Sequence, residues 1–151
     1  MIQPKFLSDQ FIDSHSAIKL YTMGINHAES VWQPPFGGNS VNWIMGHLVV
    51  SRCNFLMLLD VPSLWTKDQC MRFIPGSAPV TGDGDSVAFG TLLADFDRTQ
   101  EQLVSALKES TVEDLKHIKA ERTIVESLTY YLAHESHHAG QLEILCILAR
   151  Y

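Results

Sequence analysis

Residues 41–59 read VNWIMGHLVVSRCNFLMLL, a stretch whose apolar side chains fall on almost every face of an α-helix. A helix that is apolar all round must be covered on every side. We therefore expect this segment to be the central helix of the domain. Asn39 or Ser40 can cap its start, and Asp60 and Pro62 mark its end.

Three further segments repeat apolar residues at intervals of three and four, which is the spacing of an amphipathic helix. They cover residues 8–26, 86–110 and 123–149, with Ser8 placed to cap the first and Asp85 or Ser86 to start the second. The residues available for buried stripes are Phe11, Ile12, Ile18 and Tyr21 in the first segment and Leu92, Phe96, Leu103 and Leu107 in the second. The sequence thus predicts an all-α fold of four long helices in one domain, residues 1–151.

The connections between these helices differ in length. Residues 60–85 hold three prolines and three glycines, too many for a long helix, although a short helical turn fits residues 63–70. A connection of this length can travel the length of a bundle, so that the second and third helices run parallel. Residues 111–122 are polar and indicate a short turn of helix before the fourth long one.

Composition narrows the class of protein. Hydrophobic residues make up 46% of the chain, but no uncharged apolar run approaches the roughly 20 residues that span a bilayer. The N-terminus lacks the apolar core of a signal peptide, and Cys53, Cys70 and Cys146 form no C-x-x-C pair, which fits a reducing compartment. We expect Cys53 and Cys146 to pack as small hydrophobic residues, and a soluble, cytoplasmic protein without a membrane partner. A net charge of −6 leaves no basic stripe for nucleic acid.

The motif HESHHAGQ, residues 134–141, concentrates three histidines and a glutamate near the C-terminal end. On a helix, His134 and His138 lie about 40° apart, close enough for both imidazoles to reach one metal ion, whereas Glu135 lies about 100° from His134, on the flank. The motif contains H-E-x-x-H, the zinc-binding pattern of metalloproteases, and E-x-x-H, half of a di-iron carboxylate site.

Both of these interpretations lack ligands. A catalytic zinc site takes about three protein ligands, yet the only acidic residue after His138 is Glu143, about 140° away from it on the same helix. A di-iron site needs glutamates from neighbouring helices, and residues 41–59 contain none. The motif must therefore find its third ligand elsewhere in the chain.

His47 is the candidate for that ligand, because it lies in the middle of the most apolar helix. A buried imidazole needs either a hydrogen-bond partner or a metal ion. Alone, His47 would be read as a hydrogen-bonded core histidine. Together with a helical histidine pair that lacks a third ligand, it indicates a site made of His47, His134 and His138. We expect His15, His27 and His117 to be surface or ordinary structural histidines.

Two stretches resemble the DinB/YfiT-like superfamily of four-helix-bundle metalloproteins. NSVNWIMGHL, residues 39–48, is similar to the family's S-[IV]-x-W-x-x-x-H segment, and HESHHAGQLEIL, residues 134–145, is similar to its H-x-x-x-H-x-G-Q segment. The resemblance implies an up-down-down-up bundle, a divalent ion held by His47, His134 and His138, and often a homodimer. It also implies that Trp43 packs under His47 and that Gln141 supports the site without being a ligand.

Three imidazoles suit zinc or nickel best among the metals we expect, with copper and iron also compatible. Relatives include thiol-dependent transferases and isomerases, so the resemblance implies a metal that activates a low-molecular-weight thiol, or a water, for attack on a small electrophile. Glu135 is the candidate catalytic residue, either as a general base or to orient a ligand histidine; a solvated or ion-paired glutamate is the alternative. Arg52 and Arg72 are the single candidates for contacting an anionic thiol. The rival functions are a non-catalytic, stress-related metal-binding bundle and an H-E-x-x-H metalloprotease.

Overall fold

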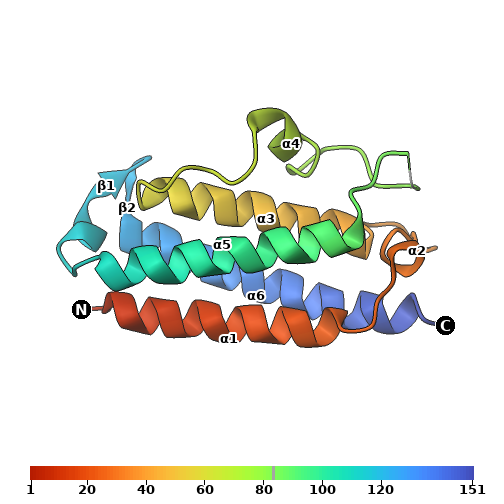
Figure 1. The fold of residues 1–151 in the computed structure, drawn as a ribbon, viewed down its shortest axis with the longest axis horizontal. Helices are drawn as coiled ribbons and strands as arrows, with labels where there is room; N and C mark the ends of the chain where they lie inside the picture. Colours follow the sequence, from red (N-terminus) through yellow and green to blue (C-terminus); the bar gives the residue numbers. More distant parts are fainter. Residues whose placement is uncertain (83) are drawn as a thin grey trace.

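The computed structural model describes residues 1–82 and 84–151, and within them four long helices form a bundle (Figure 1). These helices are α1 (Pro4–Thr22), α3 (Val41–Leu58), α5 (Phe89–Glu109) and α6 (Ile124–Leu148). The all-α expectation is confirmed. In the described part of the chain, no helix is both long and apolar enough to cross a membrane.

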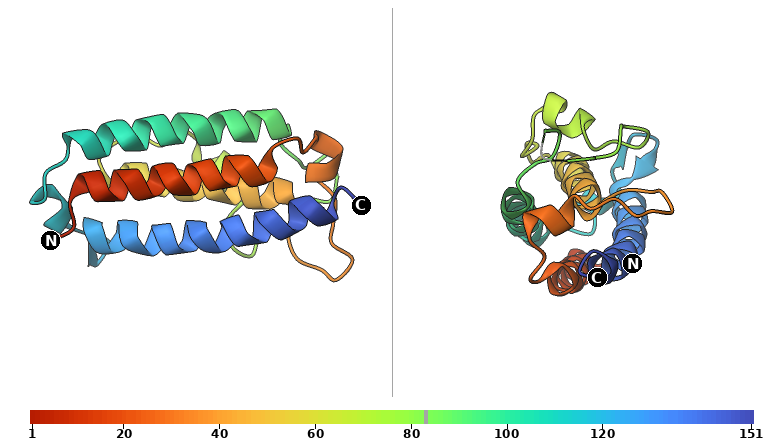
Figure 2. Two further views of the ribbon diagram at one scale, coloured as in Figure 1. Left: turned by 90° about the horizontal axis from the view of Figure 1, so that it is seen from below. Right: turned by 90° about the vertical axis from the view of Figure 1, so that its right-hand side faces the viewer.

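The helices follow an up-down-down-up course (Figure 1). Helices α1 and α6 run in one direction, while α3 and α5 run in the other (Figure 1). Helix α1 packs against α6 and α5, and α3 packs against α5 and α6, so each helix has two neighbours. The parallel pair α3 and α5 is joined by the long connection that the prolines and glycines of residues 60–85 indicate. An end-on view shows the four helices arranged around one axis (Figure 2, right).

Helix α3 is the most buried element, as its all-round apolar sequence predicts. Residues 41–53 are all buried, and the side chain of Ser40 caps the helix by accepting a hydrogen bond from the Trp43 backbone N–H. Gly46 lies on the face of α3 that meets the incoming connection, and a Cβ there would overlap the ring of Phe73. Glycine at this position therefore lets the connection pack directly on α3.

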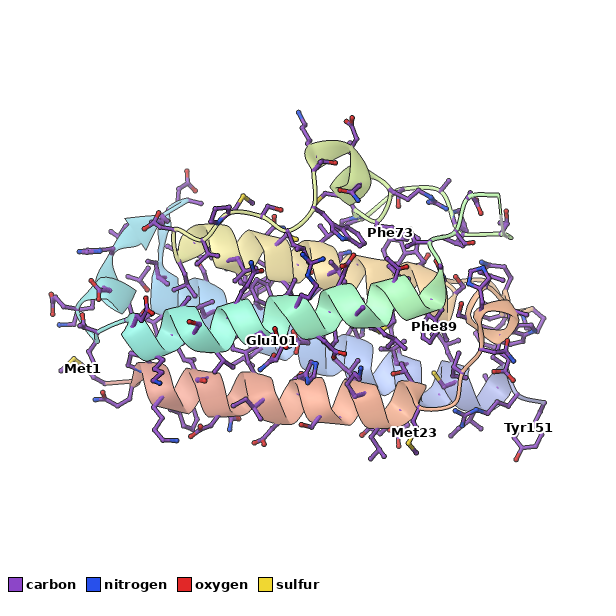
Figure 3. All side chains as sticks on the ribbon, in the orientation of Figure 1. Met1, Met23, Phe73, Phe89, Glu101 and Tyr151 are labelled. Atoms are coloured by element: carbon purple, nitrogen blue, oxygen red, sulfur yellow. The ribbon has the colours of Figure 1, made fainter. Side chains whose placement is uncertain are left out.

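That connection is ordered by a short helix and by apolar anchors. Helix α4 (Lys67–Met71) begins with a capping box between Thr66 and Gln69 and lies over the outer side of α3 (Figure 1). Phe73 is buried and lies between this segment and α3 (Figure 3). The connection thus covers the middle of α3 instead of looping into solvent.

The boundaries of two helices differ from those expected. Helix α1 begins at Pro4, with Gln3 in the N-cap position, because proline suits the first turn of a helix; Ser8 is a buried residue inside it. Within the expected stripe Phe11 and Ile18 are fully buried, but Ile12 is 41% exposed. Helix α5 begins at Phe89, later than expected, and it buries Leu92, Phe96, Leu103 and Leu107 as the spacing predicts.

The segment before α6 contains the short turn of helix that was expected and also a hairpin that was not. A single 3₁₀ turn (Asp114–Lys116) leads into a hairpin of β1 (Ile118–Lys119) and β2 (Arg122–Thr123). Ala120 and Glu121, between the strands, have φ of 51° and 70°, which a continuing right-handed helix does not allow. Thr123 and Glu126 then form a capping box that starts α6 at Ile124, one residue after the predicted start.

A short helix, α2 (His27–Ser30), lies in the connection from α1 to α3, contacts α3 and α5, and was not predicted. It begins with a capping box between Asn26 and Glu29. The three cysteines are free thiols, with Cys53 and Cys146 buried as expected and Cys70 half-buried in α4.

Candidate metal centre

Three histidines from two helices converge between α3 and α6. The Nε2 atom of His134 lies 3.0 Å from that of His47 and 3.1 Å from that of His138. One ring nitrogen from each residue lies within 4.8 Å of the other two. His47 comes from the central helix, and the other two are one turn apart on α6, so the packing of α3 against α6 brings together the three residues that the sequence singled out.

The ring of His47 is fixed on two sides. Its Nδ1 donates a hydrogen bond of 2.8 Å to the backbone carbonyl of Phe73, which can only accept, and its ring stacks on Trp43 at 5.0 Å between centroids. Trp43 is in turn held by a hydrogen bond of 2.9 Å from its Nε1 to Ser77 Oγ. The neutral ring therefore carries its hydrogen on Nδ1 and presents a lone pair at Nε2.

His138 is oriented in the same way by a neighbour on its own helix. Its Nδ1 lies 2.7 Å from Gln141 Oε1, an amide oxygen that accepts the ring hydrogen. The Nε2 of His138 is thus also a lone pair. Gln141 contacts a ligand candidate without adding a ligand atom, which is the role that the resemblance implied for it.

His134 lies between two lone pairs and can satisfy only one of them. A neutral imidazole carries one ring hydrogen, so at most one of the contacts at 3.0 Å and 3.1 Å can be a hydrogen bond. Its Nδ1 is buried without a hydrogen-bond partner. Whichever ring nitrogen of His134 carries the hydrogen, at least one polar atom of the cluster lacks a partner. A cation between the rings would accept lone pairs from all three Nε2 atoms, which neutral side chains alone cannot do.

The dimensions also fit an ion. A tetrahedral zinc with bonds of about 2.0–2.1 Å separates neighbouring ligand nitrogens by about 3.3 Å. The two short Nε2 separations, 3.0 Å and 3.1 Å, are close to that value. The third separation is within 4.8 Å, and the three histidines could therefore hold a metal ion.

Electrostatics favour the neutral, ligating form of each ring. Burial lowers the pKa of His47 and of His134, and it lowers the pKa of His138 to about 4. Near neutral pH all three imidazoles are thus unprotonated at one nitrogen. A metal ion would not have to displace protons from them.

Glu135 points away from this cluster into the core. Both its oxygens lie 2.7 Å from nitrogens of Arg52, and Oε1 also accepts a hydrogen bond of 2.6 Å from Ser14. Arg52 and Glu135 are each fully buried. The ion pair with a basic residue is therefore the observed state of Glu135, and its role as a general base stays a prediction.

Arg52 is the residue that the sequence reasoning placed wrongly. It is buried between the rings of Phe11 and Phe96, and its Nη1 donates to Gln100 Oε1. It is therefore unavailable to an anionic cofactor. An arginine within the most apolar helix indicates a buried acidic partner, because a charge in a protein core must be paired. The side chain of Arg72 is also committed, to the backbone carbonyls of Ala78 and Asp85.

The remaining histidines are structural or exposed, as expected. His15 pairs with Asp97 at 2.8 Å, and His27 Nδ1 accepts from the Phe89 backbone N–H. His117 is exposed. Over residues 1–82 and 84–151, His47, His134 and His138 are the one group of three or more such side chains with metal-site spacing.

An up-down-down-up helical bundle with three histidines clustered between two of its helices defines the class of this protein as a bundle with a candidate metal site. The sequence model of the DinB superfamily matches residues 14–142, a span that includes all three histidines. The chain belongs to the DinB superfamily. A search of curated proteins finds no match.

Proposed function

We propose that this protein is a divalent-metal-dependent enzyme whose metal is held by His47, His134 and His138, and that it transfers a low-molecular-weight thiol, or a water, to a small electrophile. The observation that carries the proposal is the convergence of imidazole lone pairs on one place, with His134 unable to satisfy both neighbours. Membership of the DinB superfamily supports it.

A divalent ion held by three neutral imidazoles keeps its full charge and an open position, and so lowers the pKa of a bound thiol or water by several units. The chain's own residues hold the rings ready for this. Phe73 and Gln141 fix the tautomers of His47 and His138, and Trp43 fixes the plane of His47. Zinc or nickel is the metal that we propose.

The first experiment is the metal content of untagged protein by mass spectrometry. The variants are His47→Ala and His138→Ala, with His137→Ala as the matched control, because His137 is an exposed histidine on the same helix that is outside the cluster. We expect one equivalent of metal in the wild type and in the control, and little in the two site variants. Metal that is retained without His47 would refute the site.

The second experiment is a screen of thiols against small epoxides and halides with the metal-loaded protein. Turnover that is lost in His138→Ala supports the enzyme. Stoichiometric metal without any turnover would favour a non-catalytic metal-binding bundle instead. A protease would require Glu135 as its base, and the buried ion pair with Arg52 argues against that function.

A further inference from the structure

A pocket of about 310 Å³ lies next to the histidine cluster, between the connection before α3 and the C-terminal half of α6. Figure 2 (left) shows that connection looping out beside the end of α6. Phe36 lines the pocket from the loop, Ile44 from α3, and Ile144 and Leu145 from α6. The volume lies at the lower end of the range for small-molecule sites.

The pocket and the histidine cluster share one neighbouring side chain, that of Gln141. Gln141 lines the pocket and also accepts the hydrogen bond from His138 Nδ1. Ile44, on the opposite wall, lies one helical turn before His47. A molecule in the pocket therefore lies within one turn of the histidines on both helices.

Two of the lining side chains are apolar and open to water. Phe36 is 72% exposed and Ile144 is 60% exposed, although each lines a hollow of molecular size. Gly37 and Gly38, with φ of 83° and 108°, give the loop a backbone conformation that other residues adopt only with strain.

The lining carries no charged side chain, and its polar side chains are those of Asn39 and Gln141. A peptide-like thiol carries carboxylates, and in this pocket they would lose their hydration without gaining a hydrogen-bond or ionic partner. It does match an uncharged apolar group that covers Phe36 and Ile144.

We propose that this pocket binds the apolar part of the electrophilic substrate, placing its reactive end at the histidine cluster, and that the thiol binds elsewhere. This inference rests on the proposed function and adds the substrate class to it: a small, uncharged electrophile with an apolar group of a few carbons. Specificity then resides in Phe36 and Ile144, and not in the ligand histidines.

The test uses zinc-loaded protein and two hydroxamates that differ only in tail length, acetohydroxamate and octanohydroxamate. Each buried methylene strengthens binding by up to about fourfold, so with about half of the six extra methylenes buried we expect the longer probe to bind at least about 30-fold more tightly. Ile144→Ser should reduce this ratio at least about fivefold and leave acetohydroxamate affinity and zinc content unchanged. Ile147→Ser is the matched control, because Ile147 is 52% exposed on the same helix and does not line the pocket.

Equal affinities for the two probes, or equal effects of the two serine variants, would overturn the inference. The inference would also be overturned if octanohydroxamate bound no more tightly than acetohydroxamate and the sedimentation coefficient fell in Ile144→Ser. A second copy of the chain would then cover the pocket. Failure of the metal site is recognised separately, by absent zinc and by no binding of acetohydroxamate. In that case octanamide, which does not chelate metal, tests whether the pocket binds an apolar tail. It should shift the methyl NMR signals of Ile44 and Ile144 but not that of Ile147.

Discussion

The ion pair of Arg52 and Glu135 offers the sharpest test of how the site is held, because both residues are fully buried and lie on the two helices that carry the histidines. Replacing Arg52 with methionine keeps an unbranched apolar side chain between Phe11 and Phe96 but removes every guanidinium contact. Glu135 then keeps only its hydrogen bond from Ser14. A buried carboxylate left without its cation is the costly outcome.

The expected magnitude follows from that geometry. Breaking a buried ion pair from one side costs about 3–5 kcal/mol, whereas removing both charges together is often close to neutral. Arg52→Met should therefore destabilise the protein by about 3–5 kcal/mol, which lowers Tm by roughly 6–20 °C for a chain of this length. Arg52→Met/Glu135→Leu should recover most of that loss, giving a coupling energy of at least about 2 kcal/mol.

The assay is urea unfolding followed by far-ultraviolet circular dichroism, with chelator present so that metal binding does not enter the balance. The cycle comprises the wild type, both single variants and the double variant. A loss below about 1 kcal/mol in Arg52→Met would refute the reasoning, because solvent must then reach the pair. Single effects that simply add in the double variant would refute it as well.

Three more predictions follow from the geometry. Gly46→Ala should displace Phe73, deprive His47 of its acceptor, lower Tm and weaken zinc binding by about 10–100-fold in a competition titration. In metal-free protein, burial lowers the pKa of His138 to about 4, below its unfolded value of about 6.5. The contribution of His138 to stability is therefore complete above pH 6.5 and falls toward pH 4, because the unfolded chain takes up the proton first. The fall in Tm over this range should be smaller in His138→Gln. Removing the metal by chelation should leave the helical dichroism intact and lower Tm, and added zinc should restore it, since a ligand at about 1,000 times its Kd stabilises by about 4 kcal/mol.

The helices could be predicted from sequence because their signals are local. Apolar spacing and the caps at Ser40 and Thr123 lie within a few residues of the elements that they define. The hairpin before α6 could not, because its two strands are two residues each and its turn depends on positive φ at Ala120 and Glu121, residues that do not favour that conformation. The start of α1 was misplaced because a serine in the core resembles a cap in sequence.

In the candidate site, too, the features with local sequence signals were predictable, and those that depend on long-range packing were not. The periodicity of α6 predicts that His134 and His138 share a face, and the apolar neighbours of His47 predict its burial. The resemblance implied supporting roles for Trp43 and Gln141, and both contact a ring of the cluster. The acceptor for His47 was not predictable, since Phe73 acts through a backbone carbonyl that any residue has. Nor was the pairing of Arg52 with Glu135, because the two residues are 83 positions apart and meet only through the packing of α3 against α6.

These two unpredicted contacts explain why a metal site can be built on core helices. Helix α3 carries His47 on the side covered by Phe73 and carries Arg52, five residues later, on a side that faces Glu135. On α6, Glu135 directly follows His134, about 100° around the helix. The ion pair therefore fixes how α3 and α6 are rotated about their own axes. With that rotation fixed, His134 and His138 face His47. We therefore expect the rings to converge as the bundle forms, without an ion to gather them.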